Sequence, residues 1–125
     1  MKTTIYSQHF DHTEWLSKLN FYKDELHVLN GRLEEITKKN NHKDFLRDVE
    51  HFQNQFMIQE KNIQDLSHVV KASEKMVKNE IAAHPVASDH RKKEVTSKEK
   101  DMVESFEKHF NALRVEFKDF AAKWM

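Results

Sequence analysis

The first residues whose types could do chemistry lie near the N-terminus, in the stretch HFDHTEW at residues 9–15. His9 and His12 are three residues apart and have carboxylates beside them. Two imidazoles and one carboxylate form a known facial set of metal ligands. The first and third predicted helices run parallel, which places Glu99 near the level of His9, with Ser73 of the second helix at the same height. His9, His12 and Glu99 are therefore the candidate metal ligands.

The same stretch also has a simpler interpretation as the start of a helix. Asp11 and Glu14 have the spacing of an N-cap residue and its capping-box partner. Phe10 and Trp15 have the spacing of a hydrophobic staple across that start. We favour this interpretation, which begins the first helix near Asp11 and leaves no metal ligand and no bound cofactor.

The other histidines give weaker signals for chemistry. Three Asp-x-x-His units, Asp24–His27, Asp48–His51 and Asp65–His68, fall away from the apolar faces of their helices, so we interpret them as solvated pairs. His109 occupies an apolar-face position roughly level with Gln59, and we expect these two to share a buried hydrogen bond that fixes the register of the bundle.

Composition excludes several classes of protein. The single Gly is incompatible with glycine-rich phosphate loops, and the absence of Cys excludes disulfides, thiolate metal sites and Cys nucleophiles. No nucleophile-plus-base arrangement stands out. We therefore expect no catalytic residues and no enzyme activity.

The charge balance bears on partners and location. Lys plus Arg and Asp plus Glu are 21 each, and the one basic run, HRKKE at residues 90–94, is short, so we expect no nucleic-acid partner. No apolar run is long enough to span a membrane, and no secretory signal is visible, so we expect no membrane contact and a cytoplasmic protein.

The elements that must position these residues are long helices. Apolar residues recur at alternating steps of three and four, which places them on one face of each helix and is typical of coiled-coil packing. The stretches at residues 38–43 and 83–89 interrupt this pattern. We predict one all-α domain over residues 1–125, an antiparallel up-down-up bundle of three long helices at about 11–39, 42–84 and 88–124. Ser88 is our favoured cap for the third helix, and a start near Thr96 is the alternative.

Several apolar residues lie off these faces and predict an interaction surface. Phe21 and Val28 are off the apolar face of the first helix, and Met57 and Ile58 are off that of the second at a similar height. The second helix also extends as an arm past the predicted start of the first. Exposed apolar patches mark interaction sites. We expect contact with a protein partner or a second copy, as a homodimer, through Phe21, Val28, Met57, Ile58, Met76, Val77 and Ile81.

The runs EWLSKLNFYKDELHVLNGRLEEITKKN, at residues 14–40, and VEHFQNQFMIQ, at residues 49–59, carry a resemblance. The chain resembles a group of small uncharacterised bacterial proteins of the Bacteroidetes type over most of residues 13–80. The resemblance carries no catalytic motif and implies a bacterial cytosolic protein of unknown activity. The three-helix layout also looks like spectrin-type repeats, at the level of fold alone.

Overall fold

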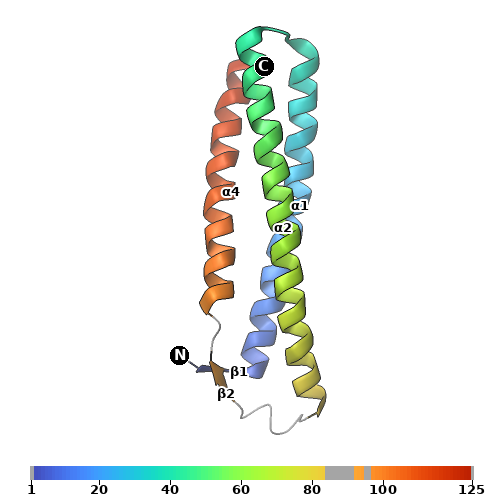
Figure 1. Ribbon diagram of the computed structural model, residues 1–125, viewed down its shortest axis with the longest axis vertical. Coiled ribbons are helices and arrows are strands. Elements are labelled where there is room, and N and C mark those ends of the chain that lie inside the picture. Colours follow the sequence, from blue (N-terminus) through green and yellow to red (C-terminus); the bar gives the residue numbers. More distant parts are fainter. Residues whose placement is uncertain (1, 84–91, 95–96, 125) are drawn as a thin grey trace.

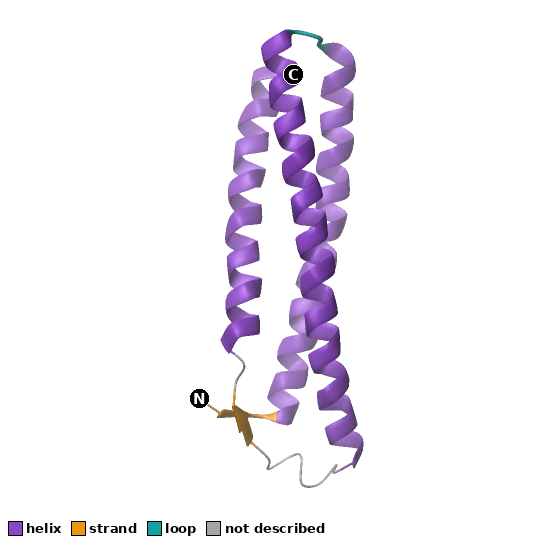
Figure 2. Ribbon diagram, viewed as in Figure 1, coloured by secondary structure: helices purple, strands orange, loops and turns teal. Residues whose placement is uncertain are grey.

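The computed structural model describes residues 2–83, 92–94 and 97–124, which form three long helices side by side and one short strand pair (Figure 1, Figure 2). The helices are α1 (Ile5–Lys39), α2 (Lys43–Ala83) and α4 (Ser97–Trp124). The strands are β1 (Lys2–Thr4) and β2 (Lys92–Glu94). Consecutive helices run in opposite directions, so the predicted all-α, up-down-up bundle is confirmed.

The core is one continuous seam between the helices. The predicted apolar face of α1 is buried at every position from Leu19 to Ile36, and Trp15 is half-buried. On α2 the predicted apolar positions are buried from Phe45 to Val77. These side chains pack because a repeat of three and four residues keeps them facing the neighbouring helix along its whole length.

Aromatic rings fill the end of the bundle where the α1–α2 loop lies. Phe45 stacks on Phe120 with ring centroids 5.8 Å apart and meets Trp124 edge-on at 5.0 Å. The Asn40 side-chain amide donates hydrogen bonds to the carbonyl oxygens of Ile36 and Trp124, both at 3.3 Å. The short loop is thereby tied to the last turn of α4.

The expected start of the first helix is wrong. Helix α1 begins at Ile5, so Asp11 lies inside it and is not an N-cap. Ile5 is fully buried, and β1 immediately before it pairs antiparallel with β2, with Lys2 opposite Glu94. Nonlocal contacts therefore hold residues 2–10 in place, and the local capping pattern does not decide where the helix begins.

The favoured start of the third helix is also wrong. Lys92–Glu94 form strand β2, and α4 begins at Ser97, next to the alternative start near Thr96. Ser88 and Thr96 themselves, together with His90 and Arg91 of the basic run, lie outside the described residues. The backbone groups of β2 find their partners in β1, more than eighty residues away, and the charge pattern of a single segment contains no sign of such pairing.

Helix α4 is also rotated relative to the expected seam. The sequence analysis placed His109 on the apolar face, but His109 is exposed. Rotation buries a row of six apolar residues instead: Val103, Phe106, Phe110, Leu113, Phe117 and Phe120. Burial of whole Phe side chains is worth about 1.5–3 kcal/mol each, which outweighs the hydrogen bond that one buried His would make.

Candidate functional site

A layer of polar side chains crosses the bundle near its strand-bearing end. His12 of α1 is buried, and its two ring nitrogens face carboxylates on two different helices. Nδ1 of His12 lies 3.1 Å from Oε1 of Glu74 on α2. Nε2 of the same ring lies 3.6 Å from Oε2 of Glu99 on α4. A single imidazole thus joins all three helices.

Two further side chains complete this layer. The Nδ1 atom of His9 contacts Oε2 of Glu74, so both oxygens of that carboxylate are engaged by imidazoles. The Ser73 hydroxyl donates a 2.5 Å hydrogen bond to Oε1 of Glu99. His9 is the exposed member, with 42% of its side chain accessible, against 8% for Glu74. We call His9, His12, Ser73, Glu74 and Glu99 the polar layer; it reaches solvent through His9.

The layer forms because helix geometry places polar residues at positions that would otherwise be apolar. His12 lies seven residues before Leu19 and seven after Ile5, both of which are buried on the same face of α1. Glu74 lies between Val70 and Val77 on the buried face of α2. Steps of three, four and seven residues bring side chains to one face of a helix, so these two point inward.

The electrostatics of the layer depend on its protons. A buried carboxylate is costly unless it is paired and hydrogen-bonded. Glu74 meets this requirement through His9 and His12. His12 presents one ring nitrogen to each of Glu74 and Glu99. These two contacts tie α1 to both neighbouring helices.

The structure brings together the three candidate metal ligands from the sequence. His12 contacts Glu99 directly, and His9 joins them through Glu74. As the side chains stand, no three His, Asp or Glu residues in the described part of the chain are arranged to hold a metal ion. In the polar layer, each imidazole faces a carboxylate oxygen directly, and the side chains do not converge on one point that an ion could occupy.

Glu74 is the member of the layer that the sequence analysis missed. It precedes Lys78 by four residues, which is also the spacing of an exposed ion pair along a helix. In the structure it is 6% exposed and turned toward α1. The alternating steps of three and four along α2 lead from Val70 to Ser73 and then to Val77, so the apolar spacing does not single out Glu74.

The expected pair of His109 and Gln59 does not form. Gln59 is buried as predicted, but its Oε1 atom has no hydrogen-bond partner in the described structure. His109 lies at the rim of a shallow groove between α2 and α4, together with Ile58 and Phe106. The rotation that buries Phe106 and Phe110 carries His109 outward.

A second polar group lies between α1 and α4. The Tyr22 hydroxyl donates a 2.8 Å hydrogen bond to Oε2 of Glu107, and Lys18 pairs with the other oxygen of that carboxylate at 3.4 Å. Burial of the phenol raises the pKa of Tyr22 to about 12, and the hydrogen bond to the Glu107 carboxylate acts in the same direction. One turn or more away, Arg114 pairs with Glu25 at 2.5 Å. This side of the bundle is closed by paired charges.

The residues proposed for an interaction surface divide into two groups. Phe21, Val28, Met57, Ile58 and Met76 are all at least half exposed, as expected. Val77 is 6% exposed and belongs to the core, and Ile81 is half-buried, so neither is a free contact residue.

The exposed residues of this set do not all share one face. Ile58 lines the groove between α2 and α4, whereas Phe21 and Val28 lie on α1 opposite its buried seam. Met57, one residue before Ile58, is turned about 100° from it around the helix axis. The predicted single patch is therefore replaced by separate apolar stripes.

None of the helices described here is both long and apolar enough to cross a lipid bilayer. No protein family model, curated protein or solved structure matches this chain, so its function is argued below from its own residues.

Proposed function

We propose that this chain is a non-enzymatic helical-bundle protein that acts by association, and that its contact surface is the outward face of α1. Three large apolar side chains lie on that face: Phe10, Phe21 and Val28 are 67%, 62% and 53% exposed. This stripe is the observation that carries the proposal.

The spacing of the stripe argues for a common surface. Phe10 and Phe21 are eleven residues apart, and Phe21 and Val28 are seven apart. Eleven residues make about three helical turns and seven make about two, so all three side chains point the same way. Large apolar side chains gathered on an outward face favour contact with another protein.

A second copy of the chain is the partner that fits this stripe. Two-fold pairing places the same surface patch of each copy against the other. Antiparallel α1 helices centred near residue 19 would set Phe10 of one copy against Val28 of the other, since both lie nine residues from that point. Both aromatic residues would then be covered in a homodimer.

Sedimentation velocity over a range of concentrations tests this proposal. We expect a dimer for the native chain and a monomer for Phe21→Glu, because a buried unpaired carboxylate opposes association. Val115→Glu is the matched control, since Val115 is 59% exposed on α4 and lies outside the stripe. A native chain that stays monomeric at every concentration, or a Val115→Glu variant that dissociates equally, would contradict the homodimer.

A second candidate function is metal binding at the polar layer, and it rests on the convergence of His9, His12, Glu74 and Glu99 from three helices. The ion would replace the protons between imidazole and carboxylate, and the His12 ring would turn one nitrogen toward it. Elemental analysis of the purified protein and thermal melting with added Zn²⁺ test this candidate. Bound metal in stoichiometric amount, lost in His12→Phe, would support it; no metal and no thermal shift would exclude it.

A further inference from the structure

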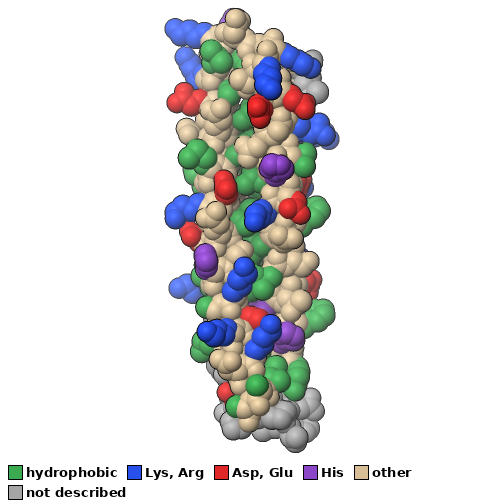
Figure 3. All heavy atoms as spheres, turned by 90° about the vertical axis from the view of Figure 1, so that its right-hand side faces the viewer, with side chains coloured by type: hydrophobic (Ala, Val, Ile, Leu, Met, Phe, Trp, Pro, Cys, Tyr) green, Lys and Arg blue, Asp and Glu red, His purple; other side chains and the backbone are tan. Residues whose placement is uncertain are grey.

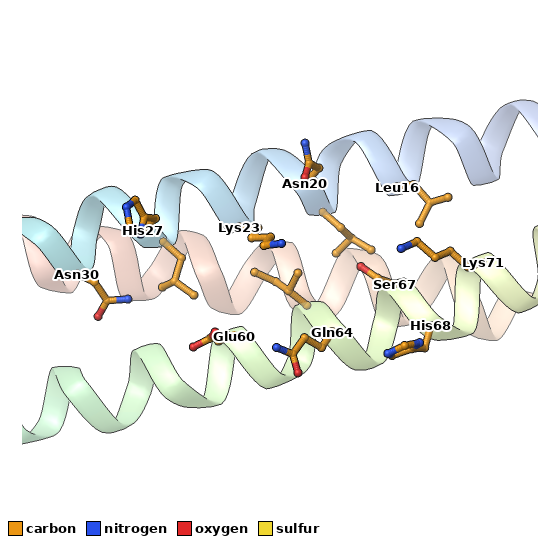
Figure 4. Close-up of a pocket in the computed structure, with 13 residues that line it drawn as sticks. Leu16, Asn20, Lys23, His27, Asn30, Glu60, Gln64, Ser67, His68 and Lys71 are labelled. Atoms are coloured by element: carbon orange, nitrogen blue, oxygen red, sulfur yellow. The ribbon is translucent and has the colours of Figure 1, made fainter.

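A groove of about 530 Å³ runs between α1 and α2 on the side away from α4. This volume falls within the range of small-molecule sites, roughly 300–1,000 Å³. Leu19, Leu26 and Ile63 are buried beneath it, and polar side chains from both helices stand around it (Figure 4). We call this feature the α1–α2 groove.

The lining of the α1–α2 groove is rich in cationic and donor groups. Lys23 and Lys71 come from opposite helices, and Figure 4 shows both side chains over the space between α1 and α2, with Lys71 ending beside Ser67 and Lys23 further along the groove. The one carboxylate of the lining, Glu60, lies toward the far end of the groove from Lys71 (Figure 4). The remaining polar side chains are histidines and amides: His27, His68, Asn20, Asn30 and Gln64.

The lysines of this groove differ from those on the neighbouring side of α1. Lys18 is ion-paired with Glu107, and Arg114 is paired with Glu25, so the α1–α4 side neutralises its own charge. Within the described residues, neither Lys23 nor Lys71 makes a salt bridge or a hydrogen bond. The whole chain has as many acidic as basic residues, so this local excess of positive charge is a property of the fold.

An anion bound between the two lysines would be attracted by both ammonium groups. Lysine is a common phosphate ligand because its ammonium group acts as a compact point charge with several donors. Figure 3 shows this α1–α2 face, on which basic, acidic and His side chains are interspersed with apolar atoms.

We infer that the α1–α2 groove binds a small phosphate-bearing molecule, with the phosphate between Lys23 and Lys71 and the hydroxyl groups of that molecule along Gln64 and Asn30. The Ser67 hydroxyl lies beside Lys71 at the phosphate end (Figure 4). This site is separate from the outward stripe of α1 and from the polar layer, and it stands whether or not the chain dimerises.

The test is titration of the full chain with inorganic phosphate and with ribose 5-phosphate, followed by calorimetry and by amide chemical shifts. We expect saturable binding of one ribose 5-phosphate per chain, tighter than that of inorganic phosphate because the sugar hydroxyls meet the amide side chains. The shifted amides should lie along the facing sides of α1 and α2.

Lys71→Gln and Lys23→Gln should each weaken ribose 5-phosphate binding roughly five- to tenfold, the effect of one charge-assisted hydrogen bond. Lys108→Gln removes an exposed lysine of α4 that does not line the groove, and it should leave binding unchanged. The native chain alone can overturn the inference, by failing to bind either phosphate up to millimolar concentration or by showing shifts elsewhere. If Lys108→Gln weakened binding equally, the binding would reflect the general charge of the protein instead of the groove, and the inference would be overturned as well.

Discussion

The two ends of this bundle fill the space between the helices with opposite kinds of side chain. At the loop end, which we call the aromatic end, Phe45, Phe52, Phe117, Phe120 and Trp124 pack ring against ring. At the strand end, the same inward positions hold the polar layer, in which two imidazoles meet two carboxylates. Apolar burial is favourable wherever water is excluded, whereas a buried charge is tolerated only with its partners present.

This contrast indicates which end stabilises the fold by itself and which end does so only when its partner side chains are in place. Contacts at the aromatic end are non-directional and act at any pH. Those of the polar layer require a particular set of protons and three helices at matched heights. We therefore expect the aromatic end to supply most of the free energy of unfolding, and the polar layer to fix the position of the first turns of α1.

The largest effect should come from the aromatic end. Phe117 is 2% exposed and lies against the rings of Phe52 and Phe56. Phe117→Ala removes a buried ring and leaves a cavity, so the free energy of unfolding should fall by about 3–5 kcal/mol. Guanidinium denaturation measures this loss, with Val115→Ala, an exposed neighbour, as a control expected to change it by less than about 0.5 kcal/mol. Equal losses in both variants would contradict the comparison.

The polar layer gives the next largest effect. Glu74→Gln keeps the shape of the side chain but removes the charge that meets His9 and His12, and it should lower the free energy of unfolding by about 2 kcal/mol. The matched pair is His51 and Glu116, which meet at 2.6 Å with about half of each side chain exposed. Glu116→Gln should change stability by less than about 0.5 kcal/mol. If both substitutions cost the same, burial does not distinguish the two pairs.

Tyr22 tests a polar contact in the middle of the bundle. Tyr22→Phe removes its hydrogen bond to Glu107 and should cost about 1.5 kcal/mol at neutral pH. The pKa of Tyr22 is raised from 10.0 to about 12 in the fold. Below pH 10 the phenol is protonated in both folded and unfolded chains, so its contribution is complete there. As pH rises from about 10 to about 12, only the unfolded chain releases this proton, and stability is lost.

Urea denaturation of the native chain and of Tyr22→Phe across that pH range isolates the effect, because other titrating groups are common to both. The stability difference between them should shrink as pH rises. A parallel absorbance titration should show one of the two tyrosines ionising near pH 12. Two tyrosines that both ionise near pH 10 would show that the hydroxyl of Tyr22 is not held by burial and Glu107.

The smallest effect concerns a residue that belongs to neither end. Gly31 lies inside α1 with ordinary helical geometry, and a Cβ atom added there would meet nothing within 4 Å. Gly31→Ala should therefore raise the free energy of unfolding by about 0.5–1 kcal/mol through helix propensity alone. Thermal melting measures the gain. A loss of stability instead would mean that α1 needs the flexibility of glycine at this point.

The amount that the sequence could predict also differs between the two ends. At the aromatic end, the repeat of three and four residues includes Phe45, Phe52 and Phe56, and all three are buried as that repeat predicts. Spacing works there because each helix has one dominant apolar face. On α4 two rows of large side chains compete, and the structure buries Phe110 and Phe117 while His109 turns outward.

At the strand end the sequence grouped residues that the structure also brings together. His9, His12 and Glu99 were grouped as metal candidates because of their expected heights, and the structure does place them together. The favoured interpretation of the same stretch as a helix start failed, since α1 begins at Ile5. The partner that links them, Glu74, was hidden by a local pattern that fits an exposed ion pair equally well.

The sequence by itself determined three helices, their order and direction, and the inward faces of α1 and α2, because these follow from periodicity and short connections along the chain. Only the tertiary structure decided the rotation of α4, the pairing of β1 with β2, and the contacts of His12 with Glu74 and Glu99. The physical reason is the separation along the chain of the residues that interact. A helix face repeats every few residues, whereas His12 and Glu74 are 62 residues apart and meet only when neighbouring helices settle at one relative height.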